Sequence, residues 1–226
     1  MIPYSFAALV YAPKRAFALG GGVIISGDDL LREISLLTAL ATSFELDSAH
    51  LNMGLTFKLH SASFGKNGDS PLNVQGDALG FSVDWGIQLF LSEKIILASQ
   101  LQNLFTGLRW NTSTLGRYRE DLPQTWIFGI GLRDFRHLNF DLDIHKSLYR
   151  DIEDQIYLGA EQLLFSRAYL RAGTAAGLNQ TQQLFYTIGG GVQQGFQNRL
   201  DFQLDAAYII HPLANMFRLS LTFRSQ

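Results

Sequence analysis

The sequence predicts an all-β protein, an antiparallel up-and-down transmembrane β-barrel with about 13 strands present of 14. Three observations lead to this fold class. Apolar and polar residues alternate with period two almost along the whole 226 residues, which is typical of strands with two different faces. Most of these segments exceed the 5–6 residues of an average soluble strand and suit a tilted membrane-spanning strand of about 9–11. Short and long connections also follow one another in strict order, as expected when turns gather at one rim of a barrel and loops at the other.

The alternating segments can be taken in order along the chain. The clearest is 199–209, in which Leu200, Phe202, Leu204, Ala206 and Tyr208 alternate with Arg199, Asp201, Gln203 and Asp205. In 138–145, apolar residues likewise alternate with Asn139, Asp141, Asp143 and His145. Segment 28–41 is ambiguous, because it is apolar on both faces and begins with aspartates that could cap a helix, and we interpret it as a strand. The predicted strands are 4–12, 16–26, 31–46, 50–63, 78–91, 95–104, 125–134, 137–146, 154–164, 167–175, 183–195, 199–209 and 215–224.

The connections between these strands form two sets. Tight turns are expected at 13–15, 47–49, 92–94, 135–136, 165–167 and 196–198. Mostly longer, polar loops are expected at 27–30, 64–77, 105–124, 147–153, 176–182 and 210–214. This regular alternation favours an up-and-down barrel over a Greek-key sandwich or a βαβ fold.

The number of strands predicts which face of the barrel is apolar. A soluble barrel such as a lipocalin has the same binary pattern, with its apolar face inside. Thirteen or more long strands enclose a lumen too wide for apolar side chains to fill. The apolar face is therefore expected to point outward into lipid, and a soluble β-barrel binding protein remains an alternative.

The composition excludes several other classes of protein. The formal net charge of −2 gives no electrostatic reason to expect a nucleic-acid partner. There is no cysteine, and the five histidines lack HxH or HxxxH spacing, so no metal site or other cofactor is expected. No run of 18 uncharged apolar residues provides a transmembrane helix. No constellation of catalytic residues emerges, and the protein is not expected to be an enzyme.

Strand counting also bears on the N-terminus. Outer-membrane barrels of bacteria generally have an even number of strands and short periplasmic turns. If the last predicted strand ends at the periplasmic rim, the first begins at the external rim. We therefore expect residues 1–226 to form a single outer-membrane barrel domain that lacks a signal peptide and one strand.

Particular segments resemble a known family. Leu158-Gly159-Ala160-Glu161 followed by Leu170-Arg171-Ala172-Gly173 resembles the "LGxE…LRAG" hairpin of the PorV/FadL-like outer-membrane β-barrel proteins. Four further segments match the same family in the same order: Gly54–Lys58, Asp84-Trp85-Gly86, Gln102-Asn103-Leu104 and Phe128–Arg133. The ending matches as well, with Ala207–Pro212 followed by Phe217–Phe223. The resemblance is carried by residues 50–224.

The resemblance implies a fourteen-stranded barrel with an N-terminal plug in the bacterial cell outer membrane, and against that family pattern we expect residues 1–226 to lack the plug. Some family members move hydrophobic molecules across that membrane, and the PorV-type members hold cargo or attachment components of type IX secretion. The implied partners are outer-membrane lipid, a hydrophobic small-molecule ligand or a secretion-system protein. Two functions follow as hypotheses: a barrel that transports or holds a hydrophobic, lipid-like ligand, and a scaffold that docks a protein through loops 64–77 and 105–124.

The polar face supplies the candidate lumen-facing residues. Glu161 and Arg171 flank the turn near Ser166 at matching distances, so they should be cross-strand neighbours, and a structural ion pair is the main interpretation. Acidic residues form one stripe at 141–145 and another at 201–205, interpreted as solvated lumen lining or as a path for a cation or other solute. The polar candidates are Lys58, Asp84, Gln102, Asp141, Asp143, His145, Glu161, Arg171, Asp201 and Asp205.

Some positions on the same face are apolar. They pack against an inward loop or plug, or they form an apolar path for a lipid-like solute, as the FadL resemblance implies. The apolar lumen candidates are Ile24, Phe90, Ile96, Tyr157, Leu163, Tyr169 and Phe185.

Overall fold

The computed structural model describes residues 3–14, 16–28, 30–65, 74–165, 167–178, 184–196 and 200–225. All of its regular elements are β-strands. They are β1 (Tyr4–Lys14), β2 (Phe17–Gly27), β3 (Leu31–Leu46), β4 (Ala49–Phe64), β5 (Gly76–Phe90), β6 (Ile95–Thr112), β7 (Gly116–Glu120), β8 (Thr125–Phe135), β9 (Leu138–Ser147), β10 (Gln155–Leu164), β11 (Ala168–Gly177), β12 (Phe185–Phe196), β13 (Leu200–Ile210) and β14 (Met216–Ser225).

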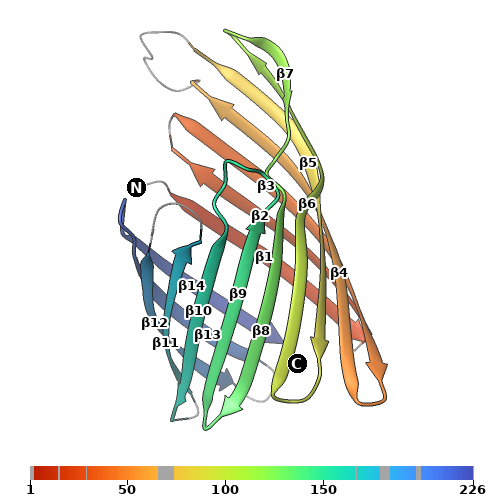
Figure 1. Cartoon of the computed structure of the whole chain (residues 1–226), viewed down its shortest axis with the longest axis vertical. Helices are drawn as coiled ribbons and strands as arrows, with labels where there is room; N and C mark the ends of the chain where they lie inside the picture. Colours follow the sequence, from red (N-terminus) through yellow and green to blue (C-terminus); the bar gives the residue numbers. More distant parts are fainter. Residues whose placement is uncertain are drawn as a thin grey trace. The chain divides into compact units, whose positions relative to one another are not determined.

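Strand order follows the chain. The path of hydrogen-bonded neighbours runs β1-β2-β3-β4-β5-β6-β8-β9-β10-β11-β12-β13-β14, and β7 pairs with β6. Sequence neighbours run antiparallel, as Figure 1 shows for β9 to β11. The thirteen strands of this path correspond to the thirteen that the sequence predicts, including the ambiguous stretch, which is β3. The predicted all-β class, with antiparallel strands in up-and-down order, is confirmed.

The region predicted as the loop 105–124 is different. β6 continues to Thr112, and after a turn at residues 113–115 the chain returns as β7 (Figure 1). Gly116 closes that turn with a φ of 69°, a backbone conformation that glycine adopts without steric cost. The prediction of a loop here was wrong. The charged residues Arg117, Arg119 and Glu120 are typical of a solvated loop, but every residue of β7 is exposed, and an exposed strand can carry charges on both faces.

The other connections lie close to the expected positions. Turns occur at 47–48, 91–94 and 136–137, and irregular segments at 121–124, 148–154 and 211–215. Most of the predicted loops 64–77 and 176–182, and part of the predicted turns 13–15, 165–167 and 196–198, lie outside the described residues.

The chain forms two compact units. Unit 1 contains Met1–Leu89, Ala98–Trp126 and Ser147–Tyr149, and unit 2 contains Phe90–Leu97, Ile127–Lys146 and Arg150–Gln226. The expectation of a single domain over residues 1–226 stays a prediction. None of the described residues forms a helix long and apolar enough to span a membrane.

In each unit, exposure alternates along the strands. On β4 of unit 1, Leu55, Phe57 and Leu59 are exposed while Thr56 and Lys58 are half-buried. On β12 of unit 2, Tyr186 and Ile188 are exposed while the residues on either side of each are half-buried. We call the face of these exposed apolar side chains the outer face and the opposite one the inner face. An apolar outer face is what a strand in contact with lipid requires.

Candidate functional site

The inner face of unit 1 carries a buried ion pair. Lys58 of β4 and Asp84 of β5 lie with Nζ and Oδ1 2.7 Å apart, and their side chains are only 14% and 12% exposed. Lys58 also donates to Oδ1 of Asn103 at 3.0 Å, and the backbone N–H of Asn103 donates to Asp84 at 2.9 Å. These bonds compensate part of the cost of removing both charges from water.

Asn103 lies at an irregular point of β6. Its φ is 54°, in the left-handed region where asparagine occurs more often than most residues. Its side-chain amide donates to the carbonyl of Pro123 at 2.8 Å. Asn103 is not among the predicted lumen residues. An amide between Leu101 and Phe105, where strict alternation expects an apolar residue, is nevertheless a signal of such an irregularity.

Beyond Asn103, side-chain hydrogen bonds join β6 to the segment 119–124. Gln124 donates to the carbonyl of Leu104 at 3.0 Å, and Arg119 donates to that of Thr106 at 2.9 Å. The N–H of Leu122 donates to the hydroxyl of Thr106 at 3.2 Å. An open pocket of about 400 Å³ lies here, lined by Phe81, Leu104, Phe105, Thr106, Arg119, Asp121, Gln124 and Tyr149.

A second polar chain crosses unit 1 next to the ion pair. The hydroxyl of Ser35 is 2.8 Å from Nδ1 of His60, and Nε2 of His60 is 2.8 Å from the hydroxyl of Ser82. Ser82 is fully buried. Ile24, predicted to line the lumen, is the direct cross-strand partner of Ser35 and is half-buried. Both ring nitrogens of His60 are thus occupied, which favours a structural role.

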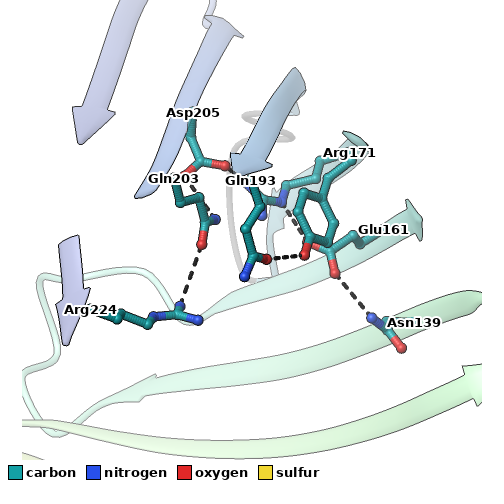
Figure 2. A network of polar contacts seen from close by, with 8 residues as sticks. Asn139, Glu161, Arg171, Gln193, Gln203, Asp205 and Arg224 are labelled. Atoms are coloured by element: carbon teal, nitrogen blue, oxygen red, sulfur yellow. Dashed lines mark hydrogen bonds and ion pairs between the residues drawn. The ribbon is translucent and has the colours of Figure 1, made fainter. Parts of the chain in front are cut away.

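The inner face of unit 2 carries a larger network around Arg171 (Figure 2). Its Nε is 2.6 Å from Oε2 of Glu161 and its Nη1 is 2.5 Å from Oδ1 of Asp205. The predicted cross-strand pair of Glu161 and Arg171 is confirmed, and Asp205 joins it from β13. The Arg171 guanidinium also lies 5.4 Å from the ring centre of Tyr169.

Amide side chains extend this network to neighbouring strands. Asn139 donates to Glu161 at 3.0 Å, Gln203 donates to Asp205 at 2.9 Å, and Tyr169 donates to Gln193 at 2.6 Å (Figure 2). We call Asn139, Glu161, Tyr169, Arg171, Gln193, Gln203 and Asp205 the Arg171 network. It spans β9 to β13, so five strands share one set of polar contacts.

Two glycines make room for these charges. A Cβ on Gly191, the cross-strand partner of Asp205, would overlap the Asp205 carboxylate. A Cβ on Gly131 would lie 3.0 Å from both Arg133 and Asp141, which form an ion pair of 2.7 Å. Glycine is used here for close approach of a side chain, which the sequence does not reveal without knowledge of the cross-strand partner.

A row of four rings crosses unit 2 where β9 ends and β10 and β12 begin. The ring centres are 4.4 Å apart for His145 and Tyr157, 6.0 Å for Tyr157 and Phe185, and 5.5 Å for Phe185 and His211. We call His145, Tyr157, Phe185 and His211 the aromatic row. The hydroxyl of Tyr157 donates to Gln155. Three of the four were predicted lumen residues, and His211 was not selected.

The remaining predicted residues are half-buried on their strands but join neither cluster through a bond described above. Leu163 is the cross-strand partner of Tyr169, and Asp201 is that of Arg224. Gln102 precedes Asn103 on β6. Phe90 and Ile96 lie at the end of β5 and the start of β6. Within the described residues, no group of three or more His, Asp or Glu side chains gathers as a metal site would require.

Comparisons with known proteins identify the fold. No protein-family model matches the chain, and no curated protein matches its sequence. Among solved structures, the CymD monoaromatic hydrocarbon channel is similar with a TM-score of 0.63 and 14% identity over 98% of this chain and 84% of CymD. A Pseudomonas aeruginosa FadL homologue matches with a TM-score of 0.63 and 12% identity over 91% of this chain and 69% of the homologue. The Pseudomonas putida toluene transporter TodX matches with a TM-score of 0.60 and 11% identity over 98% and 85%.

These likenesses show that the chain has the fold of FadL-type hydrocarbon channels. The resemblance noted in the sequence is thereby confirmed for its FadL-like part. A PorV-type relationship and a missing N-terminal strand stay predictions.

Proposed function

We propose that the protein is a non-enzymatic β-barrel of the bacterial outer membrane that transports or holds a hydrophobic small molecule. The single observation that supports this most strongly is the combination of a FadL-type fold with strands that are apolar outside and polar inside. Two solved structures of this fold are described as a hydrocarbon channel and a toluene transporter. The outer faces of both units supply the apolar surface that contact with lipid needs.

The inner faces are consistent with a solute path and not with a second apolar core. The Lys58–Asp84 pair and the Arg171 network put satisfied charges where a soluble barrel would place packed apolar side chains. A hydrophobic solute would contact the half-buried apolar or aromatic side chains among the predicted lumen residues. These are Ile24, Phe90, Ile96, Leu163 and Tyr169. These residues are the proposed lining of the path.

The test is uptake by whole cells. The chain, carrying an export signal, is expressed in a Gram-negative host without its own FadL-type channels, and uptake of radiolabelled toluene and oleate is measured. Faster uptake than in cells with an empty vector is expected for at least one of them. Protein found folded in the outer membrane without any increase would contradict transport. Protein that stays monomeric without detergent would contradict the membrane location and favour a soluble binding protein.

A second candidate function, a scaffold for a secreted or secretion-system protein, is favoured by the hairpin of β6 and β7. All residues of β7 are exposed, and so is Leu115 in the turn. The hairpin is nevertheless ordered, because Trp110 stacks on Tyr118 with ring centres 6.3 Å apart and donates to Glu120 at 2.7 Å. Deleting residues 113–118 should abolish recovery of a partner by cross-linking in cells while hydrocarbon uptake is unchanged. Equal recovery of the same partner with and without the hairpin would contradict the scaffold function.

A further inference from the structure

On the inner face of unit 2, Asp143 is a carboxylate without a direct ion pair among the described residues, and Arg133 attracts its charge only from a longer distance. Asp141 pairs with Arg133, and Glu161 and Asp205 share Arg171. Asp143 lies on β9 between Asp141 and His145, and within the described residues no Lys or Arg lies at ion-pair distance from it. It is nevertheless half-buried. A half-buried carboxylate without a cation costs free energy that a bound cation would recover.

The cross-strand register places Asp143 at one end of the aromatic row. Asp143 is directly opposite Tyr157, Tyr157 is opposite Ala175, and Ala175 is opposite Phe185. Ala175 is only 2% exposed, because the rings on both sides of it lean together into an edge-to-face contact at 6.0 Å. Direct cross-strand partners have Cβ atoms about 4.5–5.5 Å apart, so the side chains of Asp143 and Tyr157 start close together on the same face of the sheet.

The chemistry of these groups selects one kind of ligand. Ring faces attract cations placed within about 6 Å of the ring centre, and they suit large, weakly hydrated cations such as quaternary ammonium groups. A single carboxylate is too few ligands for a metal ion such as Ca²⁺, which takes 6–8 oxygen atoms. A neutral hydrocarbon would leave Asp143 uncompensated.

We propose that the inner face of β9 to β12 binds a small organic cation of the quaternary or aromatic ammonium class, held by Asp143 and the rings of Tyr157 and Phe185. This assigns a solute class to the proposed channel and rests on that function for the route by which the cation arrives. The binding site itself depends only on the geometry of unit 2.

The experiment measures binding of radiolabelled benzyltrimethylammonium to the full chain in detergent by equilibrium dialysis. The measurement is made at pH 8, where ordinary imidazoles are neutral. Asp143→Asn is expected to weaken binding at least tenfold. The matched control is Asp141→Asn, which removes the same charge from the same face of the same strand and should change affinity less than twofold. Tyr157→Phe keeps the ring and should bind like the unsubstituted chain, whereas Tyr157→Leu and Phe185→Leu should each weaken binding several-fold.

Neopentylbenzene has the shape of benzyltrimethylammonium without the charge, and it should not displace the bound cation. Displacement by neopentylbenzene as effective as that by unlabelled cation would overturn the proposal. Unchanged binding in Asp143→Asn would overturn it as well, and so would equal losses in the two aspartate variants. If circular dichroism shows that Asp143→Asn does not fold, the comparison of Tyr157→Phe with Tyr157→Leu tests the proposal instead. Equal affinities of these two variants for the cation would overturn it.

The outcome is independent of the uptake test. Cation binding without hydrocarbon uptake would contradict the proposed hydrocarbon transport and support the cation site. Hydrocarbon uptake without cation binding would contradict the cation site and support the proposed transport.

Discussion

The inner faces of the two units carry charge in different ways. In unit 1, Lys58 and Asp84 form a nearly buried pair whose remaining bonds go to Asn103. In unit 2, Arg171 is 36% exposed, and its two acidic partners are tied to amides: Glu161 to Asn139 on the next strand and Asp205 to Gln203 on its own strand. The first arrangement concentrates a large desolvation cost in one pair. The second shares the cost among several side chains and leaves part of the Arg171 and Glu161 charges in water.

This difference predicts how much each charge matters for stability. Removing one member of a buried pair leaves an uncompensated charge, which typically costs 3–5 kcal/mol. Pairs with substantial exposure contribute far less, because water and salt screen them. Four predictions test this contrast, and they are ordered by expected size.

The largest effect is expected for Lys58→Met. It leaves the Asp84 carboxylate buried with only the N–H bond from Asn103, and should lower the free energy of unfolding by about 3–5 kcal/mol. The measurement is urea unfolding in lipid vesicles followed by tryptophan fluorescence. The double variant Lys58→Met with Asp84→Asn should regain part of the loss, because the buried charge is gone. A double variant less stable than Lys58→Met would show that the ion pair is not the cause.

The next largest effect concerns an unpaired charge on the outer face. Ile188 is 57% exposed on β12, and Ile188→Arg should cost about 2–4 kcal/mol in lipid if this position lies near the midplane. Thr187→Arg is the matched control, because it places the same charge one residue away on the inner face. There its cross-strand partner is Gly173, which leaves space. Equal losses in the two variants, measured by the same unfolding assay, would reverse the assignment of the faces.

A smaller effect is expected for Arg171→Met, about 1–2 kcal/mol, because the arginine is 36% and Glu161 26% exposed. Asp205 is only 15% exposed, but it keeps the hydrogen bond from Gln203. The loss should shrink as salt is raised from 0.05 to about 1 M, where screening is strong, while that of Lys58→Met should not. The variant also leaves Glu161 and Asp205 without their cation. In planar bilayers, any ion conductance should therefore shift toward cations. A loss as large as that of Lys58→Met would contradict the contrast between the units.

The smallest effect is expected for Asp28, a fully exposed carboxylate in the turn between β2 and β3. The backbone N–H groups of Leu31 and Leu30 donate to it, at 3.0 and 2.8 Å, and they lower the pKa of the Asp28 carboxyl below its ordinary value of 3.8. Its contribution to stability is therefore complete above pH 3.8 and is lost as the pH falls through the lowered pKa. A carboxyl-carbon NMR titration measures this directly, and an apparent pKa at or above 3.8 would contradict it.

Contacts across a short turn were predictable from the sequence. Glu161 and Arg171 lie at equal distances from a tight turn, so the turn itself sets their register and makes them partners. The partner of Lys58 was not predictable, because β4 and β5 are joined by a long connection that leaves the register open. Asp205 as a second partner of Arg171 was missed for a similar reason: it depends on two successive registers, β11 with β12 and β12 with β13.

The sequence by itself determined the number and order of the strands on the main path, because alternation with period two is a local property of each segment. It did not determine the length of β6, which continues to Thr112. It also determined which face of each strand is apolar, and hence the class of fold. Only the tertiary structure decided which polar residues meet on the inner face and that Asn103 turns inward. It also decided that Asp143 lies beside the aromatic row without a direct ion pair to any Lys or Arg among the described residues. The physical reason is that such contacts join residues on different strands. Their distances depend on registers accumulated across several strands, and no single segment encodes them.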